Sequence, residues 1–166
     1  MILYILRHGI AEDAPPAGDD GARKLTARGR EKLRDSVDGM RALKLKFDVI
    51  LTSPLARATE TAEIVAAVYA NDPPPQVVPA LATGVAPQEA IAALRPFAKH
   101  RHVMIVGHEP QLTGIAATLL TSAPKGANIS LKKGGLIALE VPAASERGGA
   151  QLRWMLTPRQ MRKLGK

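Results

Sequence analysis

The chain has 166 residues, of which 46% are hydrophobic and none is cysteine, which fits one domain over residues 1–166 and excludes disulfides and cysteine nucleophiles. No apolar run approaches the roughly 20 residues that span a membrane, and the N-terminal run is too short for a signal peptide, so we expect a cytoplasmic protein. A net charge of +8 predicts an anionic partner, whereas an aromatic content of 3% argues against nucleic acid.

The first third of the chain reads as a strand, a loop and a helix. Ile2 to Leu6 is an apolar run of strand-forming residues, as expected for a strand that is covered on both faces. The acidic, proline- and glycine-containing segment from Ala11 to Lys24 predicts a loop that is long enough to lie over a site. A helix pattern then runs from Thr26, as N-cap, to about Leu43.

Two further strand and helix units follow. Val49 to Leu51 predicts a buried strand, with a helix from Pro54 that runs through Val68 and stops before Asn71 and the prolines at 73–75. The pattern next predicts a brief strand at Gln76 to Val78 and a helix at Pro87 to Lys99. The third buried strand is Val103 to Val106, and Pro110 opens the helix that follows it.

The C-terminal part ends in two strand patterns. Leu136 to Val141 and Leu152 to Met155 predict an antiparallel pair, separated by a flexible stretch from Pro142 to Gly149. The alternation of strands and helices before this pair favours an α/β fold. We therefore predict a three-layer α/β/α sandwich with a mainly parallel central sheet and a C-terminal antiparallel edge.

The residues of chemical interest stand where the buried strands end. Arg7 and His8 follow the first strand, Arg57 lies in the first turn of the helix after the second, and His108 follows the third. Parallel strands gather their carboxyl ends at one edge of the sheet, so these side chains should meet in one crevice.

Such a cluster of cations needs an anion. Two unit charges about 4 Å apart repel by about 4 kcal/mol at an effective dielectric constant near 20, and no carboxylate is adjacent in sequence to Arg7 or Arg57. A phosphoryl group is the natural partner for forked arginine donors. The same cations oppose a divalent metal at His8, so we predict neither a metal nor another cofactor.

Four motifs in this order resemble the histidine phosphatase superfamily, which includes the phosphoglycerate mutases. They are Arg7-His8-Gly9, Leu25-Thr26-Ala27-Arg28-Gly29, Ser53-Pro54-Leu55-Ala56-Arg57-Ala58-Thr59-Glu60-Thr61 and Val106-Gly107-His108-Glu109-Pro110. The small size and the early Leu-Thr stretch are similar to its phosphohistidine phosphatase branch of the SixA type. The resemblance implies a phosphoglycerate mutase-like fold and a phosphatase.

The resemblance also implies roles for the residues. His8 would attack phosphorus as a neutral imidazole and become phosphorylated, and the nearby cations disfavour its protonated form. Arg7 and Arg57 would bind the phosphoryl oxygens, and a protonated His108 would add a donor in the transition state. Ser53 is interpreted as a helix cap only.

The proposed substrate follows from a departure from the family pattern. Mutase-like members supply a glutamate acid from the middle of the fold, but the corresponding segment from Leu81 to Val85 has no carboxylate. An imidazole with a pKa near 6.5 leaves more readily than an alkoxide, so we expect phosphohistidine as the substrate. Glu12, Asp13 and Glu109 remain candidate proton donors.

Two alternatives stay open at this stage. The protein could be a broad small-molecule phosphomonoesterase, or a noncatalytic module that binds phosphoproteins in the same crevice. The intact His8 argues against the second alternative. The expected partner is thus a phosphohistidine-containing protein or a small phosphorylated molecule, while the oligomeric state is not predicted.

Overall fold

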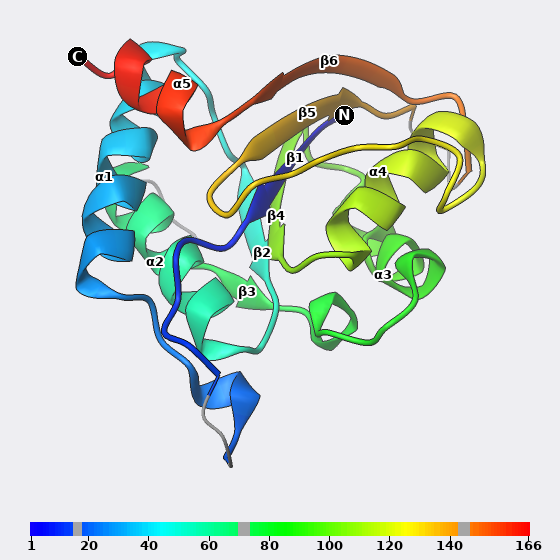
Figure 1. Ribbon diagram of the computed structural model, residues 1–166. Coiled ribbons are helices and arrows are strands. Elements are labelled where there is room, and N and C mark those ends of the chain that lie inside the picture. Colours follow the sequence, from blue (N-terminus) through cyan, green and yellow to red (C-terminus); the bar gives the residue numbers. More distant parts are fainter. Residues whose placement is uncertain (15–17, 70–73, 143–146) are drawn as a thin grey trace.

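The structure is a computed structural model that describes residues 1–14, 18–69, 74–142 and 147–166 (Figure 1). Its centre is a six-stranded sheet with the strand order β3-β2-β4-β1-β5-β6. The strands are β1 (Ile2–Arg7), β2 (Val49–Thr52), β3 (Gln76–Val77), β4 (His102–Gly107), β5 (Leu136–Glu140) and β6 (Gln151–Leu156). β1, β4, β2 and β3 are parallel to one another, and β5 runs antiparallel to β1 and β6.

Helices cover both faces of the sheet, as predicted (Figure 1). The α-helices are α1 (Ala27–Ala42), α2 (Ala56–Tyr69), α3 (Pro87–Ala93), α4 (Gln111–Thr121) and α5 (Pro158–Leu164), and short 3-10 turns lie at η1 (Asp20–Ala22), η2 (Pro79–Leu81) and η3 (Arg95–Phe97). Side chains of α1, α2 and α5 form one core with the sheet, and those of α3 and α4 form the other. The three-layer α/β/α sandwich with a C-terminal antiparallel edge is confirmed.

The alternation of side chains along β1 explains why its sequence is continuously apolar. Leu3 and Ile5 point into the core beneath α3 and α4, whereas Tyr4 and Leu6 point into the core beneath α1 and α2. Successive side chains of a strand face opposite sides, so a strand covered by helices on both sides has no polar positions in its middle. The apolar, buried part of β1 ends at Leu6, so Arg7 and His8 lie at the edge of the sheet.

Several element boundaries differ from the prediction. The helix predicted from Pro87 to Lys99 ends at Ala93 and is followed by η3, because Pro96 lacks a backbone N–H and disfavours helical backbone before it. Pro110 is the N-cap of α4 and not its first residue. In the predicted loop between Ala11 and Lys24, η1 forms and Ala11 pairs with Leu25 in an isolated bridge.

Helix α1 starts as predicted, but two of its glycines have a role that the sequence pattern missed. The Thr26 hydroxyl accepts a hydrogen bond of 2.9 Å from the Gly29 N–H, which confirms the N-cap. A Cβ atom on Gly29 would collide with the carbonyl oxygen of Ile10, and one on Gly39 would collide with that of Met161. The glycines therefore allow the loop after β1 and helix α5 to approach α1 closely.

Helix α5 is absent from the prediction, and other predicted features lie outside the described residues. The α5 segment has three basic residues, and its one fully buried apolar side chain, Met161, is too weak a pattern for a helix prediction. The predictions on Asn71, on the first proline of the 73–75 run and on the middle of the stretch from Pro142 to Gly149 fall in the gaps. No helix in the described ranges is long and apolar enough to cross a membrane.

Candidate active site

The ends of β1, β2 and β4 meet at one edge of the sheet, as predicted. The N–H of His8 donates to the carbonyl of Gly107 at 3.1 Å, and the N–H of Ser53 donates to that of Val106 at 2.9 Å. The backbone hydrogen bonds between strands therefore continue past the strand ends and align the segments that follow. The rings of His8 and His108 lie side by side, with centroids 5.1 Å apart.

The His8 ring is held in one tautomer. Its Nδ1 lies 2.7 Å from the carbonyl oxygen of Gly9, and because a carbonyl can only accept, Nδ1 carries the proton of the neutral ring. The other nitrogen, Nε2, then has a free lone pair. The Gly9 N–H donates to the hydroxyl of Thr61 at 3.1 Å, which ties this turn to α2. The sequence contains Thr61 in a motif, but its role in holding the turn was not predicted.

Burial and charge both keep His8 neutral. The pKa of His8 is lowered to about 4, first because the ring is buried and then because Arg57, Arg7 and Lys133 lie nearby; the hydrogen bond to Gly9 acts in the opposite direction. Both causes favour the neutral imidazole that the sequence argument expects. The sequence argument named only the cations, whereas burial of the ring is the larger cause.

His108 is also neutral, and its contact with Ser53 was missed. Its Nε2 lies 2.8 Å from the Ser53 hydroxyl, which in turn accepts a bond of 3.3 Å from the Leu55 N–H. Burial first, and then the charges of His8 and Arg57, lower the pKa of His108 to about 3. This lowered pKa favours the neutral ring in the unliganded protein, whereas the predicted protonated His108 belongs to the transition state and stays a prediction. Ser53 therefore lies in the turn before α2, which begins at Ala56, and its hydroxyl contacts this histidine.

Arg57 has a carboxylate partner that sequence adjacency did not reveal. Its side chain is buried and donates from Nη1 to the carbonyl oxygen of Asp20 at 2.8 Å and from Nη2 to Asp20 Oδ2 at 3.0 Å. Desolvation raises the pKa of Asp20, but the charges and hydrogen bonds of Arg57 and Arg23 outweigh it, and the net pKa is lowered. The loop around η1 therefore places the negative charge of Asp20 next to the cluster of cations.

Arg7 is anchored by the segment that precedes β5. Its Nη1 donates to the carbonyl oxygen of Leu131 at 2.8 Å, and the N–H of Gly134 donates to the carbonyl oxygens of Arg7 and His8, at 3.0 Å to each. This segment also brings Lys133 to His8. The sequence signal for it, two lysines followed by two glycines, was not used in the prediction.

The cluster retains unused donors. Within the described residues, Nε of Arg7 and Nε of Arg57 are buried without a hydrogen-bond partner, and so is Nδ1 of His108. Buried polar atoms are nearly always paired, so three orphaned atoms on neighbouring side chains indicate that a polar ligand belongs here. Forked arginine donors suit a phosphoryl group best.

The candidate proton donors have other hydrogen-bond partners. The Glu12 carboxylate accepts from the Lys24 N–H at 3.4 Å. The Glu109 carboxylate accepts from the hydroxyl and N–H of Thr113, at 2.7 and 3.2 Å, at the start of α4. Neither carboxylate bonds to His8 or His108 in the described part of the chain. The Asp13 side chain is exposed.

The sequence of the chain is similar to those of known proteins. Residues 3–82 match the model of the histidine phosphatase superfamily (branch 1). An uncharacterized protein of Picosynechococcus sp. is 38% identical over 150 residues, which are 87% of each chain.

Solved structures share the fold at low identity. The protein histidine phosphatase SixA, solved in complex with tungstate, gives a TM-score of 0.83 at 23% identity and covers 96% of this chain and 98% of that one. The alpha-ribazole phosphatase from Shigella flexneri gives 0.74 at 20% identity, with 95% and 97% covered. Phosphoserine phosphatase from Entamoeba histolytica, in complex with 3-phosphoglyceric acid, gives 0.70 at 15%, with 96% and 98% covered. The motifs, the fold and the family model agree, and the chain therefore belongs to the histidine phosphatase superfamily and is a phosphatase.

Proposed function

We propose that this phosphatase hydrolyses phosphohistidine on a partner protein, without a metal ion, through a phosphohistidine intermediate on His8. The observation that carries the proposal is the state of His8: a buried neutral ring whose Nδ1–H is bound to Gly9, so that Nε2 is free to attack. A nucleophile in this state, surrounded by the cations of Arg7 and Arg57, suits an incoming phosphoryl group.

The reaction has two steps. In the first, the lone pair of His8 Nε2 forms a bond to phosphorus while the bond from phosphorus to the substrate nitrogen breaks, and the electron pair of that bond stays on the substrate imidazole. In the second, water attacks phosphorus, the bond to Nε2 breaks, and orthophosphate leaves with His8 neutral again. Arg7 and Arg57 hold the phosphoryl oxygens in both steps, which is electrostatic stabilisation of the type that dominates phosphoryl transfer.

His108 contributes a donor without carrying a charge. The Ser53 hydroxyl accepts from the Leu55 N–H and can donate its own proton to His108 Nε2. His108 Nδ1 then carries the ring proton, and this is the atom that is buried without a partner. In the unliganded protein a neutral Nδ1–H can thus donate to a phosphoryl oxygen, and protonation of His108 in the transition state stays a prediction.

The absence of a glutamate in the segment from Leu81 to Val85 favours phosphohistidine over phosphate esters. An alkoxide leaving group needs a positioned acid, whereas an imidazole that takes a proton on its far nitrogen from solvent leaves as a neutral base. The likeness to the protein histidine phosphatase SixA supports the same substrate. The likeness to alpha-ribazole phosphatase keeps a small-molecule phosphomonoesterase as the competing function.

A substrate comparison tests the proposal. Purified full-length protein is assayed in EDTA on a phosphohistidine protein, on free phosphohistidine and on sugar phosphates. We expect kcat/KM for the phosphohistidine substrates to exceed that for sugar phosphates by at least about a hundredfold, the size of one general acid contribution. Higher kcat/KM on sugar phosphates would establish the phosphomonoesterase instead. The His8→Ala variant separates enzyme from binding module, because turnover that survives in this variant would exclude His8 as nucleophile.

A further inference from the structure

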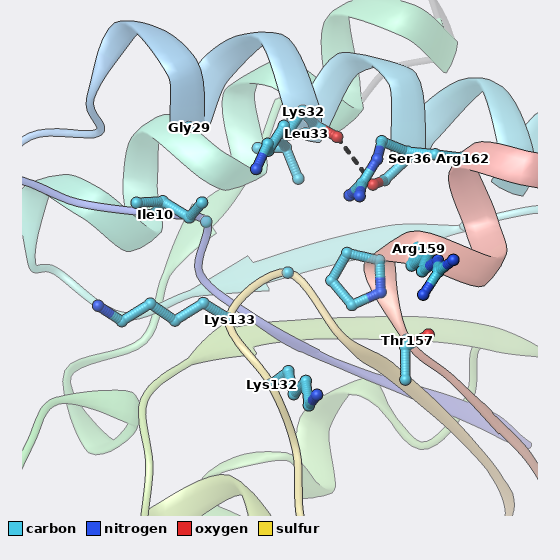
Figure 2. A pocket seen from close by; sticks show the side chains of 13 residues that line it. Ile10, Gly29, Lys32, Leu33, Ser36, Lys132, Lys133, Thr157, Arg159 and Arg162 are labelled. Atoms are coloured by element: carbon cyan, nitrogen blue, oxygen red, sulfur yellow. Dashed lines mark hydrogen bonds between the residues drawn. The ribbon is translucent and has the colours of Figure 1, made fainter.

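A second concentration of positive charge lies beside the candidate active site. Residues of α1, of the segment before β5 and of the start of α5 enclose a cavity of about 370 Å³, which we call the basic pocket (Figure 2). Its lining also includes Gly9 and Ile10, the residues that directly follow His8. The basic side chains that line it are Lys32, Lys132, Lys133, Arg159 and Arg162.

The basic pocket has no internal counter-charge. None of the residues that line it is acidic, and none of its five basic side chains forms an ion pair in the described ranges of the chain. Several like charges around one cavity repel one another, and an anion that enters reverses this cost. The pocket therefore selects a negatively charged ligand.

The fold holds these cations together instead of leaving them on mobile tails. Helix α5 packs on α1 at the point where Gly39 meets the backbone of Met161, and Met161 is fully buried. The side chains of Lys32 and Arg162 are half-buried on these two helices. Figure 2 shows that the basic side chains come from three separate elements. A permanent structure of this kind is expected of a binding site more than of a solvated face.

The remaining residues of the pocket indicate whether its ligand is a protein or a simple polyanion. The side chains of Ile10, Leu33 and Pro158 give the pocket an apolar part. A free phosphate or polyphosphate gains nothing from apolar surface, whereas an acidic peptide segment presents carboxylates on aliphatic stems and apolar neighbours between them. The size, the charge and the apolar part together favour a polypeptide.

We propose that the basic pocket binds an acidic segment of the phosphorylated partner protein and thereby sets substrate specificity. This inference rests on the proposed function, because the pocket is lined by Gly9 and Ile10, the residues that follow His8, and so lies close to a partner that is bound there. Lys133 belongs to both regions, since its charge also acts on His8. The cations of the pocket then lower KM for an acidic partner, while the residues at the strand ends carry out the phosphoryl transfer.

Paired peptides test the inference. Each peptide carries one phosphohistidine, flanked by a run of Glu in one peptide and by a run of Gln in the other. We expect the protein to prefer the Glu peptide roughly tenfold in kcat/KM at low salt, through KM, because two or three partly exposed ion pairs supply an effect of this size. The Lys32→Gln/Arg162→Gln variant should lose the preference and keep its kcat on free phosphohistidine.

A second variant and a matched control make the result specific. The Lys132→Gln/Arg159→Gln variant removes the same charge at two other positions, one in the segment before β5 and one on α5, so a single misfolded variant does not decide the outcome. The Lys46→Gln/Lys99→Gln control removes two charges from exposed positions at the opposite end of the sheet. The inference is overturned if the control and the pocket variants lose the preference equally, or if the parent protein shows none. Loss of activity on tripolyphosphate in the pocket variants alone would assign the pocket to a small polyanion.

A binding measurement keeps this inference separate from the proposed function. Calorimetry with the unphosphorylated Glu and Gln peptides requires no catalysis. Tighter binding of the Glu peptide to the parent protein, lost in both pocket variants, supports the basic pocket even if the protein fails to hydrolyse any phosphohistidine. Equal binding of the two peptides contradicts it even if hydrolysis is fast.

Discussion

One hydrogen bond at His8 decides which ring nitrogen is available. The bond from Nδ1 to the Gly9 carbonyl fixes the tautomer, and burial of the ring keeps it neutral, so the lone pair of Nε2 needs no general base. The same side chain in solvent would be partly protonated near pH 6.5. The tautomer and the protonation state of His8 therefore depend on its neighbours, namely Gly9, Thr61 and the nearby arginines.

The contribution of the Ser53 hydroxyl to catalysis, through its bond to His108, can be tested. The change Ser53→Ala removes the bond to His108 Nε2, so the ring loses its orientation and its preferred tautomer. We expect kcat/KM on phosphohistidine to fall about tenfold, which corresponds to about 1.4 kcal/mol of transition-state stabilisation. The Thr118→Ala variant is the matched control, because it removes a buried hydroxyl that bonds only within α4. An unchanged kcat/KM in Ser53→Ala would show that the Ser53 hydroxyl serves only the turn before α2.

Among the elements, the contact between α1 and α5 supports both the core and the basic pocket. Gly39 allows the two helices to touch, because any side chain at this position meets the Met161 carbonyl. We expect Gly39→Ala to lower the free energy of unfolding by about 1–3 kcal/mol, as for overpacked sites, although alanine is the better helix former. Urea denaturation of this variant and of Glu31→Ala, an exposed change on α1, measures the difference. A stabilised Gly39→Ala protein would contradict the packing.

The loop around η1 competes with the ligand for Arg57. Asp20 Oδ2 accepts from Arg57 Nη2, so a phosphoryl group that binds Arg57 through this nitrogen must displace the carboxylate. In Asp20→Asn the competing charge is gone, and we expect vanadate to bind roughly threefold to tenfold more tightly, within the range of a partly exposed ion pair. Calorimetry against the Asp19→Asn control measures this effect. Weaker vanadate binding in Asp20→Asn would mean that Asp20 orders Arg57 for the ligand.

Sequence reasoning located the elements that are strongly periodic or buried on both faces. β1, β2, β4 and the strand ends that carry Arg7, His8 and His108 follow directly from apolar runs. It missed what depends on long-range contact: the ion pair of Asp20 with Arg57, which are 37 residues apart, and the bond of Ser53 with His108, which are 55 apart. Helix α5 was missed because the segment is short and has one fully buried apolar side chain, Met161, which is buried by packing against α1.

For the whole molecule, the two buried histidines link stability to pH. In the unfolded chain both rings take up protons below pH 6.5, whereas the native pKa of His8 is about 4 and that of His108 about 3. Protons therefore favour the unfolded state, and the free energy of unfolding falls as the pH drops from 6.5 towards 4. We expect a slope of up to about 1.4 kcal/mol per pH unit for each histidine. Urea denaturation between pH 7 and 5 should show this loss.

The control for this pH dependence removes the two rings. The double variant His8→Asn/His108→Asn should lose most of the slope between pH 7 and 5, because the remaining acidic groups titrate mainly below this range. A wild-type protein whose stability is constant down to pH 5, or a double variant with the full slope, would show that these rings are not buried in neutral form.

The most direct test of the central claim, that a cationic edge of the sheet presents Nε2 of a neutral His8 to a phosphoryl group, is to trap the intermediate. The protein is mixed with radiolabelled phosphohistidine substrate and quenched within the first turnover. We predict a label on the protein that is stable in alkali, labile in acid, located by peptide mapping at His8 and absent from His8→Ala. An acid-stable label, or an equal label on His8→Ala, would contradict the account.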